Sequence, residues 1–338
     1  MIDSPGTTSD SPGAAVQTDA QKAHASTRLG LLFGFGAYGI WGFFPLYFPL
    51  LEPASPIEIL SERFVFSLAF MALILTVTRS WARLTPVLRD RRVMLLLCGA
   101  ALAISVNWGT YIWAVNDDQV VEASLGYFIN PLVLVLIGVV LLGERLRTLQ
   151  WVAVTIATLA VIVLTVAVGR LPWIALVLAF LFALYGLIKK LAGVDPQASL
   201  TIETAVASPF ALAYLVYLQT SGELVLFHDT TQTTLLLMGT GVITAIPLLA
   251  FGGAANRLPL TTIGLLQYLT PMIQFAIGVW VVGESMPTAR WAGFAIVWLA
   301  LAVFSYDGLR QGSINRAARR SGTDAAGEPA DTGVEPPI

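Results

Sequence analysis

Residues 137–151 read IGVVLLGERLRTLQW and residues 277–291 read IGVWVVGESMPTARW, so the chain carries nearly the same stretch twice. When residues 125–165 are laid over 265–305 without a gap, 13 of the 41 positions are identical. Apolar helices often match by chance, but a proline, a Gly-Glu pair and a tryptophan also fall in register: Pro131 with Pro271, Gly143-Glu144 with Gly283-Glu284, and Trp151 with Trp291. This pattern indicates an internal repeat.

The composition places both copies in a membrane. Of the 338 residues, 56% are hydrophobic and only 12% are charged, whereas a soluble domain needs more charge to cover its surface. The net charge of −2 gives no reason to expect nucleic acid. One cysteine, Cys98, excludes an internal disulfide, and two histidines, His24 and His228, are too few for a catalytic or zinc site. We therefore expect neither a metal nor a cofactor.

Ten apolar stretches are long enough to cross a bilayer, which takes about 20 residues of helix. The chain is therefore expected to be an all-α polytopic membrane protein. Polar residues, proline and glycine bound the stretches at 30–51, 57–79, 93–116, 119–142, 149–169, 171–191, 199–219, 233–254, 260–282 and 288–308. Residues 1–28 and 309–338 are rich in polar residues, glycine and proline, and are predicted to be disordered tails.

The basic residues predict how the ten helices are oriented. If the N-terminus is cytoplasmic, 16 of the 19 lysines and arginines fall on the cytoplasmic side. Arg170 and Arg290 fall on the other side, and Arg63 falls within a span. This asymmetry is the positive-inside signal. We expect a multi-pass protein of the cell membrane with both termini in the cytoplasm.

An odd number of spans, five, separates the two copies, so the second copy is expected to have the opposite orientation. The prediction is two inverted five-helix repeats, residues 29–169 and 170–308. Inverted repeats mark secondary transporters, in which each half can open toward one side of the membrane. The two Gly-Glu turns are expected to build this fold, with each glycine ending a helix and each glutamate capping or pairing nearby.

Several stretches resemble one transporter family. AYGIWGFFPLYF (37–48), EASLGYFINPL (122–132), GERLRTLQW (143–151), ALYGLIKK (183–190) and GLLQYLTP (264–271) are similar to the RarD-type branch of the EamA family, in the drug/metabolite transporter superfamily. The Gly-Glu turn is shared widely, whereas EASLGYFINPL is more specific. The resemblance covers residues 29–308 and implies a ten-helix permease. The branch is named for a role in chloramphenicol resistance, which fixes no substrate here.

The candidate binding residues gather around two prolines that are expected to break their helices near the membrane centre. Pro131 and Pro271 lack the N–H that would bond four residues back. Gln267, Thr270 and Gln274 share one helix face with Pro271, and Tyr127 and Asn130 match the first two of these in the other copy. Such a stripe faces either a substrate cavity or another helix through hydrogen bonds. Asn107 and Tyr111, one turn apart on the third span, are further candidates for the cavity.

Arg63 is the cation most deeply placed in a predicted span. The apolar run after it is too short to cross the bilayer alone, so the span must begin before Arg63. Inside the membrane a guanidinium costs about 2.5–3.5 kcal/mol on insertion scales unless it is paired or hydrated. Arg63 therefore faces the outer half of a cavity or snorkels to the outer interface.

Three glutamates are candidates for coupling transport to an ion such as a proton. Glu62 neighbours Arg63 but points about 100° away from it on a helix. Glu203 roughly matches Glu62 in the second copy, and an acidic residue in the first turn of its helix is the alternative. Glu122 is expected at the outer rim, because a complete apolar span follows it.

These features favour a secondary-active transporter of small organic molecules, working by alternating access. The chain has no phosphate-binding loop, so an ion gradient or exchange would supply the energy. An exchanger of phosphorylated or nucleotide-linked sugars is an alternative, although it would need several cations in the cavity. A non-transporting scaffold or sensor is another, and an intramembrane enzyme fits least. The expected partners are the lipid bilayer, the substrate and a proton, with a homodimer left open.

Overall fold

The computed structural model describes residues 12–142, 146–255, 257–258 and 260–325, and every regular element within them is helical. The elements are α1 (Pro12–Gly42), α2 (Phe44–Tyr47), η1 (Phe48–Leu51), α3 (Pro56–Val77), η2 (Trp81–Arg83), α4 (Leu84–Arg89), α5 (Arg91–Asn116), α6 (Val120–Leu142), α7 (Thr148–Val168), α8 (Trp173–Ala192), α9 (Pro196–Ser221), α10 (Thr231–Ala255), α11 (Leu260–Leu266), α12 (Leu269–Ile277), the π-helical turn η3 (Gly278–Val282) and α13 (Thr288–Ala325).

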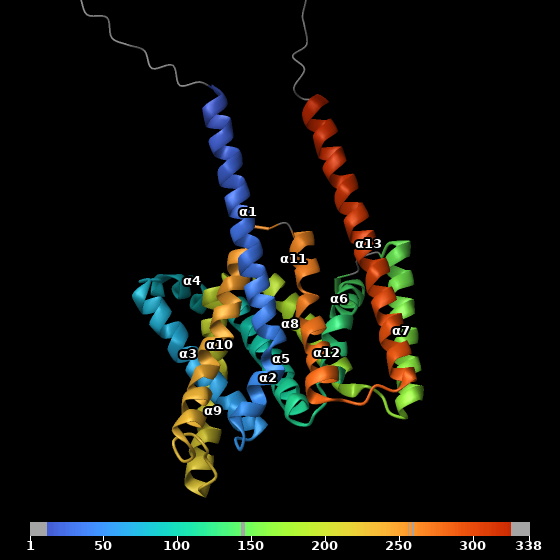
Figure 1. Cartoon of the computed structure of the whole chain (residues 1–338). Coiled ribbons are helices and arrows are strands. Elements are labelled where there is room, and N and C mark those ends of the chain that lie inside the picture. The colour runs from blue at the N-terminus through green and yellow to red at the C-terminus, as the bar shows by residue number, and fades with distance from the viewer. Residues whose placement is uncertain (1–11, 143–145, 256, 259, 326–338) are drawn as a thin grey trace, which may run out of the picture.

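The predicted spans are found in the described part of the chain. Nine stretches of helix there are long and apolar enough to cross a membrane. A tenth forms if residues 25–42 of α1 and residues 44–51, which meet at 45°, are counted as one bent span. The all-α membrane fold is thereby confirmed. Both ends of the described chain emerge on the same side of the bundle (Figure 1), as an even number of crossings requires.

Local sequence explains where the helices begin and end. The side chain of Ser55 accepts a hydrogen bond from the backbone N–H of Glu58 and caps α3, and Asp195 caps α9 in the same way. A proline, Pro56 or Pro196, takes the first position of each helix, where its missing N–H costs nothing. Gly222 ends α9 at a φ of 77°, a left-handed conformation that favours glycine.

The starts of four helix pairs are spaced 140 positions apart. Pro56 and Pro196 open α3 and α9, and Arg91 and Thr231 open α5 and α10. The same spacing separates the starts of α6 and α11, at positions 120 and 260, and those of α7 and α13, at 148 and 288. This spacing equals the offset between the two copies of the repeated stretch.

The helices pack into one bundle through small residues. α3 lies against α9 and α10, α8 against α5 and α6, α12 against α1 and α6, and α7 against α13 at the edge (Figure 1). Gly241 lets α10 approach α3 closely, because a Cβ there would lie 2.3 Å from the carbonyl carbon of Phe66. Gly126 similarly allows α6 to meet α8, where a Cβ would lie 2.7 Å from the carbonyl oxygen of Ala175.

The terminal segments differ from the predicted disordered tails. α1 begins at Pro12 and α13 continues to Ala325, so both helices project beyond the bundle (Figure 1). Each extension continues the helix of an apolar span, so no new nucleation is needed. Residues 14–28 also contain several alanines and neither proline nor glycine, which suits a helix better than their polarity implied.

Candidate functional site

Arg63 lies inside an aromatic cage in the bundle. Its guanidinium carbon is 3.7 Å from the ring centre of Trp108, and 5.3 Å and 5.9 Å from those of Phe44 and Phe48. The Nε–H donates to the hydroxyl of Thr244 at 2.7 Å. The residue is only 2% exposed, so the alternative that Arg63 snorkels to the interface is wrong. Cation–π contacts stabilise the desolvated charge by about 2 kcal/mol.

The cage leaves hydrogen-bonding atoms unused. Among the described residues, Nη1 of Arg63 and the hydroxyl of Tyr111 are buried without a hydrogen-bond partner. Arg63 is also the only buried lysine or arginine in the described part of the chain. Buried donors without partners cost about 1–3 kcal/mol each, so they are rare where no ligand or water is to be bound.

Polar groups of α5 and α6 continue from the cage toward α8. The amide nitrogen of Asn107 donates to the carbonyl of Leu178 at 3.0 Å, and the hydroxyl of Tyr127 approaches the amide oxygen of Asn107 at 3.4 Å. The ring of Tyr127 also meets that of Tyr111, with centres 5.6 Å apart. The structure thus brings together the candidates predicted on the third and fourth spans.

The stripe of the second copy has two kinds of partner. Gln267 reaches Asn130 across the bundle, with 3.4 Å between amide nitrogen and amide oxygen, and Asn130 also donates to the carbonyl of Ala179. Thr270 and Gln274 instead donate to backbone carbonyls of α1, at 2.8 Å and 3.1 Å. Thr270 therefore holds helices together, while the amide oxygen of Gln274 is buried without a partner within the described structure.

The two prolines act differently. The expected break at Pro131 is absent, because α6 runs through it from Val120 to Leu142. One missing hydrogen bond is tolerated in a membrane helix, because neighbouring helices and side chains can satisfy the freed carbonyl. The second copy is interrupted between α11 and α12, at Gln267 and Tyr268, so that Pro271 sits in the first turn of α12.

A pocket of about 160 Å³ lies at this break between α11 and α12. Residues of α6, α11 and α13 and of the break itself line it: Pro131, Gly264, Leu265, Gln267, Tyr268, Phe304, Ser305, Gly308 and Leu309.

Glu203 is buried with a full set of partners. Its carboxylate accepts hydrogen bonds from Ser199, Tyr185 and Lys189, at 2.6, 3.0 and 2.9 Å. α9 begins at Pro196, so Glu203 lies two turns into the helix. The alternative of an acidic first-turn residue is therefore wrong. Glu203 joins α9 to α8 through a hydrogen-bonded ion pair.

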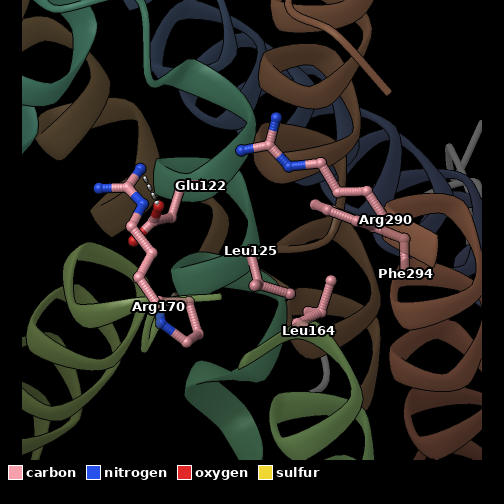
Figure 2. Close-up of a pocket in the computed structure, with 7 residues that line it drawn as sticks. Glu122, Leu125, Leu164, Arg170, Arg290 and Phe294 are labelled. Carbon is pink, nitrogen blue, oxygen red and sulfur yellow. Dashed lines mark hydrogen bonds and ion pairs between the residues drawn. The ribbon is translucent and has the colours of Figure 1, made fainter. Parts of the chain in front are cut away.

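Glu122 lies in the first turn of α6, as expected of a residue at the end of a span, but it is buried rather than rim-exposed. It accepts the backbone N–H of Ile174 at 3.1 Å and pairs with Arg170 at 3.2 Å. Figure 2 shows this pair on one side of a small pocket and Arg290 on the other. The rest of the lining, which makes most of it apolar, is Leu125, Leu164, Pro172 and Phe294.

Glu62 differs from the other acids. It is 0% exposed, and within the described structure neither carboxyl oxygen has a hydrogen-bond partner. Glu58, one turn earlier on α3 and equally buried, accepts the backbone N–H of Val225 at 2.7 Å. Two buried acids on one helix are therefore treated in opposite ways.

The second Gly-Glu turn caps a helix of the other half. Gly283 ends η3 at a φ of 79°, and the carboxylate of Glu284 accepts the backbone N–H of Val121 in the first turn of α6 at 2.7 Å. Arg290 lies 3.7 Å away. Burial raises the pKa of Glu284, although the Val121 N–H and Arg290 oppose that shift. Gly143 and Glu144 lie outside the described residues.

Sequence reasoning missed the walls of the Arg63 cage. Neither the aromatic walls nor the polar partner of Arg63 was predicted: Phe44, Phe48, Trp108 and Thr244. Aromatic residues recur through 38–48, but the sequence does not tell which rings face inward.

No cluster of three histidine, cysteine, aspartate or glutamate side chains suitable for a metal occurs in the described part of the chain.

Comparisons with known proteins agree on one family. The EamA-like transporter family model matches residues 28–166. Protein RarD of Streptomyces exfoliatus is 52% identical over 88% of this chain and 94% of its own length. An uncharacterized transporter of Vibrio cholerae is 41% identical over 90% of this chain and 98% of its own. The chloramphenicol-sensitive protein RarD of Pseudomonas aeruginosa is 32% identical over 86% of this chain and 97% of its own.

A solved crystal structure shares the fold. It superposes with a TM-score of 0.55 at 18% identity, over 82% of this chain and 97% of that one. The match covers nearly the full length of each of these relatives. The chain belongs to the EamA-like transporter family, among its RarD-type members.

Proposed function

We propose that this chain is a secondary-active transporter of small organic molecules, such as drugs or metabolites, that works by alternating access in the cell membrane. The observation that carries the proposal is the Arg63 cage. A cation is held between aromatic rings with one nitrogen unused, and the unused hydroxyl of Tyr111 belongs to the same cluster. Such a group of donors and rings suits a substrate with a hydrogen-bond acceptor on an apolar body.

Two features support a two-sided mechanism. The helix starts that recur 140 positions apart agree with two repeats of the same design, and an odd number of spans between copies would invert the second. The pocket at the break between α11 and α12 includes Gln267, which reaches Asn130 of the other half. Movement of one half against the other would then expose this central layer to each side in turn.

No observation favours the sugar-phosphate alternative. Phosphate groups are normally bound by several cations or backbone N–H groups. Arg63 is the only buried cation in the described structure, and the nearby walls are aromatic. An organic molecule with at most one anionic group fits this cage better.

The test is flux of a defined compound. The chain is purified and placed in sealed proteoliposomes, and uptake of radiolabelled chloramphenicol is compared with that of protein-free vesicles in a counterflow format. Chloramphenicol is the first probe because one relative is named for sensitivity to it. Compounds that differ between the media of deletion and overexpressing cells are tested next. Protein-dependent counterflow of one of these compounds supports the proposal, and its absence for all of them favours a scaffold or sensor.

A further inference from the structure

The buried acids in the interior can be ranked by how well the fold satisfies them. Glu203 has three donors, one of them a lysine ammonium. Glu122 has Arg170 and a backbone N–H. Glu62 has no donor from the described residues for either oxygen, although it is completely buried. Only Glu62 lacks what an ionised carboxylate needs in an apolar interior.

The surroundings of Glu62 do not supply a compensating charge. On α3 itself, Glu58 lies one turn away and would repel a second negative charge. Arg63 is the adjacent residue, but its contacts are with Trp108 and Thr244.

The helices packed against α3 add no cation that could pair with Glu62. α10 carries no titratable side chain, α9 carries Glu203, already paired, with Tyr214 and Tyr217, and the titratable residues of α5 are Tyr111, Cys98 and the arginines at its start, Arg91 and Arg92. Isolating an ionised carboxylate in such a setting costs several kcal/mol, whereas the neutral acid is tolerated.

We propose that Glu62 is the proton-carrying residue of this transporter and that the coupling ion is a proton. The coupling role of Glu62 rests on the proposed function, whereas its protonation follows from its burial and its missing partners alone. In the state that the structure describes, the carboxyl is the neutral acid. Opening of the neighbouring helices to water would let the O–H bond break and leave a hydrated carboxylate, with the proton passing to water on that side.

When no substrate is bound, return to the closed arrangement requires the carboxylate to take a proton back, because the ionised form cannot be buried without a partner. A bound substrate that donates a hydrogen bond to the carboxylate is such a partner, so closure with substrate proceeds without the proton. A proton released on one face is then bound on the other face, in exchange for substrate, in each cycle. No bond to carbon changes, and no other reactant is needed. Glu58 is the internal control, since it is equally buried on the same helix but serves as the acceptor for Val225.

The first test is infrared spectroscopy of the purified full chain in detergent, which detects the C=O stretching band of a protonated carboxyl. At neutral pH we expect this band in wild type, its loss in Glu62→Gln, and its retention in Glu58→Gln. Retention of the band in Glu62→Gln, or no band in wild type, overturns the proposal whatever the chain transports. Elution as a single species in gel filtration shows that each variant is folded.

The second test measures coupling in proteoliposomes with an imposed pH gradient and radiolabelled chloramphenicol. Wild type is expected to accumulate the probe in response to the gradient. Glu62→Gln is expected to keep counterflow at equal pH, whereas its gradient-driven uptake should be at least tenfold lower than that of wild type. A Glu62→Gln variant that still responds to the gradient overturns the assignment. Absence of wild-type flux counts against the probe or the proposed function instead, and the infrared comparison then decides the protonation of Glu62.

Discussion

At the scale of single residues, the charges inside the bundle are each held by a different arrangement. Arg63 is stabilised by ring faces and one hydroxyl, Glu203 by three donors, and Glu122 by an arginine at the helix end. Glu62 has none of these. This contrast separates ion pairs that hold the helices together from groups that remain free to bind a substrate or a proton.

Replacement of Arg63 is expected to abolish transport before it abolishes folding. Arg63→Ala removes the free guanidinium N–H that would bind the substrate, and the loss of a charge-assisted hydrogen bond of about 2 kcal/mol weakens affinity roughly 30-fold. Arg63→Lys keeps a charge but not the planar group over Trp108, so partial counterflow should remain. Flux and gel filtration are measured together for each variant.

Two further variants separate the possible roles of Arg63. Arg257→Ala is the control and should transport like wild type, because it changes an exposed arginine that donates to the carbonyl of Gly253 and lies over the ring of Phe33, away from the cage. Thr244→Val removes the hydrogen bond that the Thr244 hydroxyl accepts from Nε, together with the one that it donates to the carbonyl of Thr240. Loss of soluble, monodisperse protein in both Arg63→Ala and Thr244→Val would show that the cage has a structural role and would contradict its assignment to substrate binding.

At the scale of elements, the turn that ends one half caps a helix of the other. Glu284 follows η3 and binds the first turn of α6 through the Val121 N–H. Helix caps of this type are worth about 1 kcal/mol. The cap therefore joins the two halves on the face opposite the termini, and its loss should loosen that face first.

Glu284→Ala is expected to lower thermal stability in detergent by about 1 kcal/mol, whereas Glu284→Gln retains an acceptor and should cost less. The pH dependence follows from the raised pKa of Glu284, whose main cause is burial. Because the folded state binds the proton more tightly than the unfolded state, this site stabilises the protein most at acidic pH and less as pH rises through the folded pKa. The stability of wild type relative to Glu284→Gln should fall from acidic to neutral pH. An unchanged difference would contradict the assigned cause.

The close contact of α10 with α3 leaves no room for a side chain at Gly241. A Cβ at position 241 would lie 2.3 Å from the carbonyl carbon of Phe66, so Gly241→Ala must push two helices apart. We expect a loss of about 1–3 kcal/mol, measured as a lower melting temperature and higher proteolysis. Gly186→Ala on α8, where a Cβ would meet nothing within 4 Å, is the matched control. Equal stability of the two variants would contradict the packing.

At the scale of the whole molecule, the lengths of the apolar stretches and the polar residues, prolines and glycines between them predicted the number and order of the helices. Apolar length fixes a span, and residues such as Ser55-Pro56 and Asp195-Pro196 fix its beginning. The continuous passage of α6 through Pro131 was not predictable, because packing against α8 outweighs one missing hydrogen bond. The cage around Arg63 depends on which faces of α2, η1, α3, α5 and α10 meet, and a single sequence does not contain that information.

Alternation of the two halves of the bundle around one layer can be measured by cysteine accessibility. Single cysteines are placed at Tyr127, inside the cage region, and at Gln267, in the pocket at the broken helix, in a Cys98→Ala background. A membrane-impermeant thiol reagent is then applied from each side of sealed vesicles, with and without chloramphenicol. We predict that both positions react, that the side from which they react changes with conditions, and that a transported compound slows the labelling. Protection of both positions from both sides, in variants that still transport, would contradict alternating access at this layer.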